Sequence, residues 1–316
     1  MSIDFAATFG KTLDPQFAAL LKDVFRAPVS ASGEAQLALE DGTAAPVIGH
    51  IPRFVSSDRY VGSFSFQWSH YTTVLHDSLH DSTFSLRDFT EKFDLGPEDV
   101  RGRLFLDAGC GTGRVCEILA GWGGYVVGVD LSRSVEVARQ HLQPFDNVVV
   151  LQGDIGDLPF RPEAFDMVVS TGVLHHTPDT RAYAARLVPL VRPGGEFAIW
   201  VYDTRFRRRK QWTPLTSRLP HPAFDQWCNW IVGVASDNRG DPALEMFLRL
   251  FPFATHHETA ARSALTLFDG YTPTYHGVHS EDEVMEWFRD FGLTDIRTNR
   301  IPTSVRGRKP ETAADG

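Results

Sequence analysis

The feature that most constrains this chain is a glycine-rich turn that directly follows an apolar run. Residues 104–106 (Leu-Phe-Leu) predict a buried strand, and residues 107–113 continue it as Asp-Ala-Gly-Cys-Gly-Thr-Gly. Glycine tolerates positive φ and lets the backbone approach a ligand closely. A strand, a glycine-rich turn and the N-terminus of a helix together form a nucleotide-binding corner. We therefore predict a nucleotide-type site at this turn.

Between residues 103 and 202 the sequence alternates strand-like apolar runs with helix-like amphipathic runs. The predicted strands are 104–106, 125–129, 148–151, 165–170 and 195–202. Apolar strands separated by amphipathic helices indicate a parallel sheet covered on both faces. A helix over 281–291 and a hairpin beginning at Leu293 follow later in the chain. We predict an α/β fold: a Rossmann-like, doubly wound, mostly parallel seven-stranded sheet with an N-terminal extension and a helical insertion after strand five.

Changes of pattern divide the chain into four predicted segments. They are an N-terminal extension of small α+β type (1–58), the core (59–202), a helical insertion or lid (203–270), and a C-terminal helix and hairpin that complete the core (271–316). The extension has helical periodicity over 14–26 and a hairpin signal at Asp41-Gly42. The tryptophans and phenylalanines of the insertion predict a lid core or a contact in a homodimer.

Charge and cysteine content narrow the range of partners. The formal net charge of −9 over 316 residues disfavours non-specific binding of nucleic acid. Three cysteines without regular spacing argue against a disulfide framework and fit a reducing cytoplasm. No Cys-x-x-Cys pair is present, so we expect no metal site. The N-terminus lacks the pattern of a signal peptide, and no apolar run approaches the ~20 residues that span a bilayer. We expect a cytoplasmic protein with no membrane partner.

An acidic residue leads the glycine turn. Asp107, at the end of the predicted strand, would repel a pyrophosphate but suits a cation such as an ammonium or a sulfonium. The turn therefore favours S-adenosylmethionine over a dinucleotide. Asp130 ends the second strand, ~20 residues after the turn, where a carboxylate can accept hydrogen bonds from both ribose hydroxyls. The alternatives are a tight structural turn and an aspartate that caps the next helix.

Two further strand ends carry polar residues. After the third strand, Asp154 can accept from an adenine amine while Ile155 covers the ring, although Asp154 could instead cap a turn. After the fourth strand, the loop over 170–179 contains His175 and His176. Ligands lie beyond the carboxyl ends of strands in open parallel sheets, and the pKa of histidine is ~6.5. Either histidine could therefore act as a general base; internal packing and helix capping are the alternative roles.

Taken in order, these motifs resemble those of the class I S-adenosylmethionine-dependent methyltransferases. The matching runs lie at 106–113, 127–130 (Val-Gly-Val-Asp), 153–160 (Gly-Asp-Ile-Gly-Asp-Leu-Pro-Phe), 172–179 (Gly-Val-Leu-His-His-Thr-Pro-Asp) and 193–195 (Pro-Gly-Gly). They cover about residues 100–202. The flanking runs at 51–54, 63–68 and 305–310 resemble those of one subgroup of these methyltransferases, whose members belong to varied small-molecule and glycan pathways. The N-terminal region of such relatives often resembles a cysteine-ligated zinc module; this chain has no cysteine there, so we expect a metal-free extension.

The resemblance implies S-adenosyl-L-methionine as the cofactor and a role for each motif. The cofactor-binding residues would be Tyr60, Phe66, Trp68, Asp107, Gly109, Cys110, Gly111, Gly113, Asp130, Leu131, Asp154, Ile155 and Thr171. The three aromatic residues among them would fold over the methionine part, because a sulfonium near aromatic faces gains ~1 kcal/mol or more when desolvated; core packing is the alternative. His175 and His176 would be catalytic, and Tyr202, Tyr275 and His276 would line the acceptor pocket.

We therefore expect a methyltransferase that moves a methyl group, by in-line displacement, to a small-molecule acceptor such as a natural product, a sugar or an amino-acid derivative. Methylation of tRNA or another RNA is one alternative, favoured by the basic run at 205–210 and disfavoured by the net acidity. A regulator or scaffold that binds the cofactor without turnover is another. The sequence leaves open the acceptor, the methylated atom and the oligomeric state.

Overall fold

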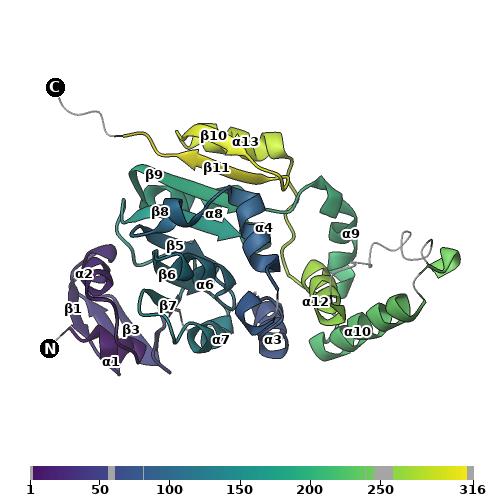
Figure 1. Cartoon of the computed structure of the whole chain (residues 1–316), viewed down its shortest axis with the longest axis horizontal. Helices are drawn as coiled ribbons and strands as arrows, with labels where there is room; N and C mark the ends of the chain where they lie inside the picture. Colours follow the sequence, from purple (N-terminus) through teal and green to yellow (C-terminus); the bar gives the residue numbers. More distant parts are fainter. Residues whose placement is uncertain are drawn as a thin grey trace.

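The computed structural model describes residues 3–55, 61–80, 82–238, 240–244, 246 and 259–311, without the side chains of Arg208 and Arg209. Its main element is a seven-stranded sheet of order β10-β11-β9-β8-β5-β6-β7 (Figure 1). The strands are β5 (Leu104–Ala108), β6 (Tyr125–Asp130), β7 (Val148–Gln152), β8 (Phe165–Thr171), β9 (Val191–Trp200), β10 (Thr294–Thr298) and β11 (Ser304–Arg308). Strands β5 to β9 pair in parallel, whereas β11 runs antiparallel to β9 and β10 to β11. This confirms the predicted mostly parallel seven-stranded sheet.

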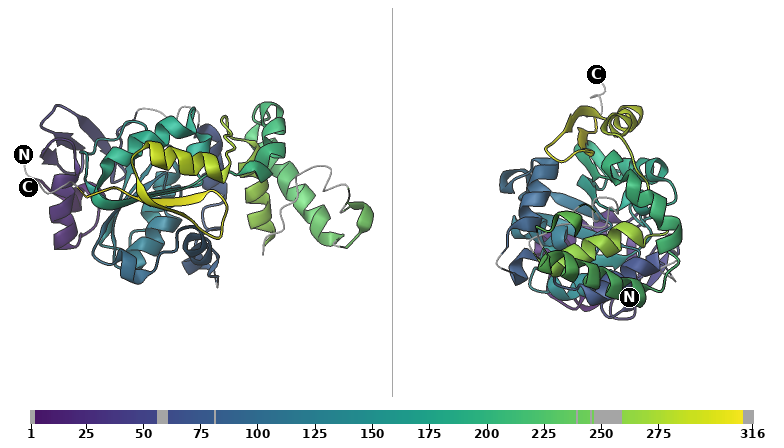
Figure 2. Two further views of the ribbon diagram at one scale, coloured as in Figure 1. Left: turned by 90° about the horizontal axis from the view of Figure 1, so that it is seen from above. Right: turned by 90° about the vertical axis from the view of Figure 1, so that its right-hand side faces the viewer.

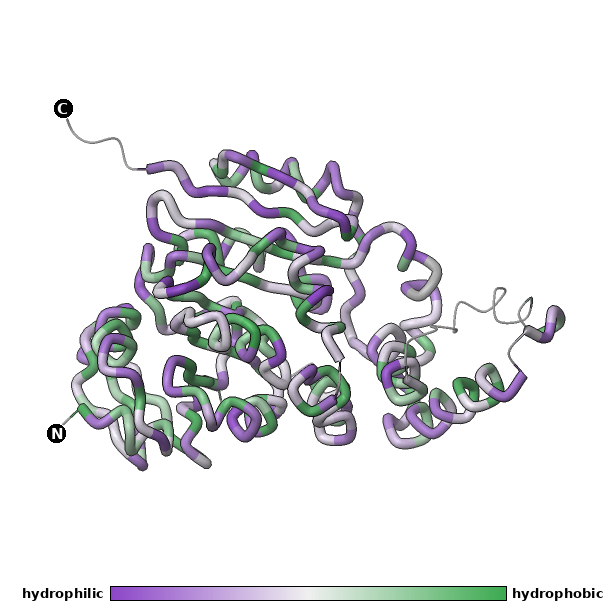
Figure 3. The backbone as a smooth tube through the Cα atoms, in the orientation of Figure 1, coloured by the Kyte–Doolittle hydropathy of each residue, from purple (hydrophilic) through white to green (hydrophobic). Residues whose placement is uncertain are grey.

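Helices cover both faces of the sheet, because its strands are apolar on both sides. Along β5, Leu104 and Leu106 join one core cluster and Phe105 joins the other, as the alternation of side chains along a strand requires. The first face packs against α2 (Pro15–Val24), α8 (Thr180–Leu187) and α13 (Glu281–Asp290). The second face packs against α4 (Phe84–Phe93), α6 (Arg114–Gly121) and α7 (Ser134–His141). In Figure 3 the strands in the middle of the sheet carry much of the hydrophobic colour, whereas β11, next to the edge strand β10, is largely hydrophilic.

The N-terminal unit is a small antiparallel sheet with two helices. Its elements are α1 (Phe5–Phe9), α2, β1 (Val29–Ser32), β2 (Gln36–Leu39), β3 (Ala44–Ile48) and β4 (Ile51–Pro52). The predicted hairpin at Asp41-Gly42 joins β2 to β3, with Gly42 at φ +87°. Strand β1 was not predicted, because Pro28 and Gly33 suggest a break. The unit packs beside β7 through a bridge between Arg53 and Gln152.

Among the described residues, three of the helices between β9 and α13 form a third apolar cluster together with a helix that precedes β5. They are α9 (Arg207–Thr216), α10 (His221–Asp237) and α12 (Ala260–Tyr271), which we call the helical segment; the earlier helix is α3 (Gly62–His70). Phe224, Leu265 and Phe268 are among the buried members of this cluster. Figure 2 shows the helical segment and the N-terminal unit at opposite ends of the molecule. Among the described residues, none of the helices has the length and apolar character needed to cross a membrane.

The remaining short elements are α5 (Pro97–Val100) and the 3-10 turns η2 (Asp77–Leu79), η3 (Leu174–His176), η4 (Val188–Leu190) and η5 (Thr204–Phe206). Strand β9 begins at Val191, four residues before the predicted start, and ends at Trp200, so Tyr202 lies beyond the strand. Helix α7 begins at Ser134, with Arg133 at its N-cap. The Ser132 hydroxyl donates to the Asp130 carboxylate at 2.6 Å.

Candidate functional site

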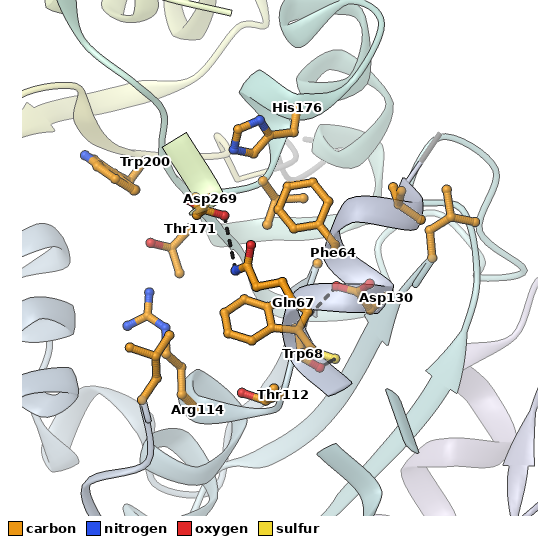
Figure 4. A pocket seen from close by; sticks show the side chains of 18 of the residues that line it. Phe64, Gln67, Trp68, Thr112, Arg114, Asp130, Thr171, His176, Trp200 and Asp269 are labelled. Carbon is orange, nitrogen blue, oxygen red and sulfur yellow. Dashed lines mark hydrogen bonds between the residues drawn. The ribbon is translucent and has the colours of Figure 1, made fainter. Parts of the chain in front are cut away.

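A cavity of about 350 Å³ lies at the carboxyl ends of the parallel strands (Figure 4). Its walls come from the glycine turn after β5, the ends of β6, β8 and β9, the loops after β7 and β8, and helices α3, α4 and α12. Open parallel sheets bind their ligands at this edge. Among the described residues, no group of three or more His, Cys, Asp or Glu side chains could hold a metal ion.

The backbone of the glycine turn after β5 forms one wall of the cavity. Gly109 (φ +91°) and Gly111 (φ +55°) both lie in the left-handed region and both line the cavity. A Cβ at Gly109 would stand 2.4 Å from Val173, so this backbone needs glycine. Gly113 (φ +90°) does not line the cavity and its predicted contact is corrected: it is the N-cap of α6, where a Cβ would meet Leu142 at 2.8 Å.

Asp130 lies in the wall at the end of β6. Its Oδ2 accepts from the Gly111 amide at 2.9 Å, and its Oδ1 accepts from the Ser132 amide at 2.8 Å and from the Ser132 hydroxyl. Asp130 lines the cavity, and its predicted hydrogen bonds with both ribose hydroxyls stay a prediction. Burial raises the pKa of Asp130, against the hydrogen bonds from Ser132 and Gly111.

Asp107 is not among the residues that line the cavity, and its predicted contact with a cationic ligand stays a prediction. The carboxylate is 1% exposed and accepts a hydrogen bond from the Cys116 thiol at 3.2 Å. The alternation of side chains along β5 directs it behind the turn, toward α6. Burial raises the pKa of Asp107 to about 7.

The other predicted strand-end residues line the cavity. They are Cys110, Leu131, Asp154, Ile155 and Thr171. Oδ1 of Asp154 accepts from the Gly156 amide at 2.8 Å, which fixes the carboxylate at the loop after β7. The Thr171 hydroxyl is buried at the end of β8 and has no hydrogen-bond partner among the described residues.

Helix α3 supplies an aromatic wall that was only partly predicted. Phe64, Gln67 and Trp68 line the cavity, because positions i, i+3 and i+4 share one face of a helix. Phe66 lies on the opposite face and stacks on His70, with ring centroids 4.1 Å apart, so its predicted place over the cofactor is corrected. Tyr60, also predicted there, lies outside the described residues.

His176 lines the cavity, and its contacts determine its tautomer. Nδ1 lies 3.0 Å from the Tyr275 carbonyl oxygen. A carbonyl only accepts, so Nδ1 carries the proton and Nε2 carries the lone pair. Nε2 is buried and has no protein partner within the described ranges. Burial lowers the pKa of His176, although Asp269 partly opposes this shift, so the ring is neutral at pH 7.

His175 is oriented in the opposite way and does not line the cavity. It is fully buried, its Nδ1 accepts from the Tyr202 amide at 3.2 Å, and its ring stacks on Tyr202 at 3.8 Å. Burial holds the pKa of His175 well below its usual range. Successive side chains in a 3-10 turn point about 120° apart, so η3 directs only one of the two histidines into the cavity. The structure therefore brings His176, and not His175, to the cavity wall, and the predicted catalytic role of His175 stays a prediction.

Of the predicted acceptor residues, Tyr202 alone is in the wall. Its Oη donates to Asp269 Oδ2 at 2.8 Å. Tyr275 contributes its carbonyl to His176 rather than its ring. His276 packs behind Tyr202, with ring centroids 5.1 Å apart, and is not in the wall.

Two groups of cavity residues were not predicted. Asp269 of α12 accepts from Gln67 Nε2 at 3.3 Å as well as from Tyr202, and so connects the helical segment to α3 and to the end of β9. Lys92 of α4 is 3% exposed, donates to Asp88 at 2.8 Å, and lies 3.8 Å from the centroid of the Trp200 ring. Burial lowers the pKa of Lys92 to about 8. A lysine on the apolar face of an otherwise amphipathic helix was the available signal.

Part of the chain is similar to known methyltransferases. Residues 106–199 match a family model described as a methyltransferase domain. A ubiquinone biosynthesis O-methyltransferase of Thiobacillus denitrificans is 37% identical over 114 residues, or 34% of this chain and 47% of that protein. The Coxiella burnetii protein of the same name is 32% identical over 110 residues, with the same two shares. A solved S-adenosylmethionine dependent methyltransferase from Mesorhizobium loti is 26% identical over 34% of this chain and 53% of that chain, with a TM-score of 0.30.

The chain spans about half the length of the curated relatives it matches. The segment that matches the family model contains Asp130, Asp154 and His176. Gln67 and Asp269 lie outside it. The family match therefore covers the strand-end side of the cavity and not the side that α3 and α12 build.

Proposed function

We propose that this chain, a member of the class I S-adenosylmethionine-dependent methyltransferases, moves a methyl group to a small-molecule acceptor held between the ends of β8 and β9 and helix α12. The observation that carries the proposal is the lone pair of His176 Nε2, which is buried in the cavity wall without a protein partner among the described residues.

The wall residues fit S-adenosyl-L-methionine. When bound, this cofactor supplies an electrophilic methyl group on a positively charged sulfur, whose leaving group is a neutral thioether. The carboxylate of Asp130 would bind the ribose, and Asp154 with Ile155 would hold the adenine. The turn at Gly109 and Gly111 would let the methionine part lie against the backbone.

His176 is suited to accept the proton that the acceptor must lose. Its proton sits on Nδ1, held by the Tyr275 carbonyl, so Nε2 is available as a base. Because its pKa is lowered, the ring is in the basic, neutral form at pH 7. A positioned base of this kind contributes typically 10²–10⁴-fold to rate.

Most of the remaining acceleration would come from alignment and exclusion of water, for which well-oriented systems reach ~7–11 kcal/mol. Gln67 and Tyr202 both donate to Asp269, so the helical segment is connected across the mouth of the cavity. Apolar and aromatic residues, among them Phe64, Phe206 and Leu265, line this end. The names of the ubiquinone-pathway relatives support a small-molecule acceptor.

The test combines binding with a search for the acceptor. The full chain is incubated with S-adenosylmethionine labelled in the methyl group and with a cell extract separated into small molecules, RNA and protein. We expect label in the small-molecule fraction, and far less when the same fraction meets the Asp130→Asn variant. Label confined to RNA, or cofactor binding without transfer to any fraction, would contradict the proposal.

A further inference from the structure

The side of the cavity next to the helical segment presents hydrogen-bond acceptors. We call it the acceptor-side wall, formed by Gln67, His176, Thr177, Tyr202, Thr266 and Asp269. The three hydroxyls of this wall all donate within the protein: Tyr202 to Asp269 at 2.8 Å, Thr177 to the Leu174 carbonyl at 2.7 Å, and Thr266 to the Arg262 carbonyl at 2.9 Å.

The side-chain N–H donors of the wall also form hydrogen bonds within the protein. Gln67 Nε2 donates to Asp269, so its Oε1 remains, buried and without a partner among the described residues. His176 donates through Nδ1 to a carbonyl, so Nε2 remains as a lone pair. The wall therefore offers an amide oxygen, an imidazole lone pair and a carboxylate. A ligand group must bring its own hydrogens to satisfy them.

The wall also carries the carboxylate of Asp269, which has no basic side chain as a hydrogen-bond partner among the described residues. Within the described part of the chain, the partners of Asp269 are the neutral Gln67 amide and the Tyr202 phenol. The basic side chains Lys92 and Arg114, which also line the cavity, both donate to Asp88 instead. Aromatic rings lie close by: Phe64 stands 5.1 Å from the His176 ring, and Phe206 stacks on Tyr202 at 4.3 Å. A carboxylate among aromatic faces suits a cation.

We propose that the acceptor-side wall recognises a protonated amino group of the methyl acceptor, so that the reaction is an N-methylation. This inference rests on the proposed function and names its substrate class. Asp269 would bind the ammonium by charge, while Gln67 Oε1 and His176 Nε2 would accept its hydrogens. The O-methyltransferase relatives do not decide this point, because Gln67 and Asp269 lie outside the matched family segment.

Methylation of an ammonium group first requires the loss of one proton, and His176 is placed to accept it. His176 Nε2 takes one proton from the ammonium, which leaves a neutral amine with a lone pair. This lone pair forms the new N–C bond as the C–S bond breaks, and the sulfur keeps the electron pair of the broken bond. The methylated nitrogen becomes positively charged again and remains opposite Asp269. The imidazolium then releases its proton to solvent when the product leaves.

Three aromatic probes of similar shape test the inference: phenethylamine, 2-phenylethanol and 3-phenylpropionate. Each is titrated by calorimetry into the full chain saturated with S-adenosylhomocysteine. We expect the amine to bind at least tenfold tighter than the alcohol and the carboxylate not to bind. Asp269→Asn should abolish this preference. Tyr202→Phe should keep it, because the carboxylate remains, and thermal melting of both variants checks that they fold.

Equal binding of amine and alcohol, or a preference that survives in Asp269→Asn, would overturn the inference. The cofactor's own sulfonium is the other cation that Asp269 could face. If Asp269→Asn lowers only the affinity for S-adenosylmethionine relative to S-adenosylhomocysteine and leaves the amine preference intact, the inference is also overturned. Repeating the amine titration without S-adenosylhomocysteine separates the two proposals. A preference for the amine that depends on Asp269 in this titration would support the amine site even if the cofactor fails to bind. Failure of the cofactor to bind would overturn only the proposed function.

Discussion

Replacing the two adjacent histidines one at a time should give opposite results. His176→Ala removes the buried lone pair in the cavity wall, so kcat should fall by about 10²–10⁴, the usual contribution of a positioned base. At 1.36 kcal/mol per tenfold, this corresponds to roughly 3–5 kcal/mol of barrier. The substitution also removes the hydrogen bond to the Tyr275 carbonyl and the packing on Phe64, so thermal melting is measured to check that the variant folds.

His175→Ala should instead reduce stability. The ring is fully buried, and its loss leaves a cavity against Tyr202 and removes the acceptor of the Tyr202 amide. We expect a cost of roughly 3 kcal/mol from the lost packing and the unpaired amide. For a chain of this size, that lowers the melting temperature by on the order of 5 °C or more.

The assay pairs initial rates at saturating cofactor with thermal melting, over a range of pH. Because burial lowers the pKa of His176 and the neutral ring is the base, the rate should be constant near pH 7 and fall only below pH 6.5. This acidic limb should be absent in His176→Ala. A His176→Ala enzyme with full kcat and an unchanged pH profile would refute the reasoning, as would a His175→Ala protein with unchanged stability.

Two further predictions concern buried residues near the cavity, Gly128 and Lys92. Gly128→Ala should lower the free energy of unfolding, measured in urea, by about 1–3 kcal/mol, because the new Cβ would lie 2.8 Å from the Cys116 sulfur and 3.2 Å from the Cys110 sulfur. Adding Cys116→Ala should recover part of this loss. A Gly128→Ala variant of unchanged stability would contradict this packing. Lys92→Met tests the buried ammonium, whose pKa is lowered from 10.5 to about 8. Between these values the unfolded chain binds more protons than the folded one, so the stability of the unsubstituted protein should rise with pH relative to the variant; parallel pH curves would exclude the shift.

The sheet was largely predictable because its strands are locally encoded. Five apolar runs separated by amphipathic helices indicated β5 to β9, and the glycine turn placed the cavity at the end of β5. The start of β9 was missed because Pro193-Gly194 is typical of a turn. In the structure, Gly194 takes φ +71° inside the strand, which continues past it.

The cavity residues were most predictable where they adjoin a strand end. Asp130 and Asp154 met this condition, and both line the cavity. Phe66 did not, because α3 was not predicted and the sequence did not show which of its aromatic residues shared a face. Gln67 and Asp269 are 202 residues apart, and no local pattern indicates that they meet. Their pairing depends on how α12 packs against α3 in the folded chain.

The most direct test of the account is a calorimetric titration of S-adenosylhomocysteine into the unsubstituted protein and into Asp130→Asn. We expect one binding site per chain. Binding to Asp130→Asn should be at least tenfold weaker, because the substitution removes the negative charge and one acceptor oxygen from the side chain placed to bind the ribose. Affinity unchanged by Asp130→Asn, or no binding to the unsubstituted protein, would contradict the assignment of this cavity as the cofactor site.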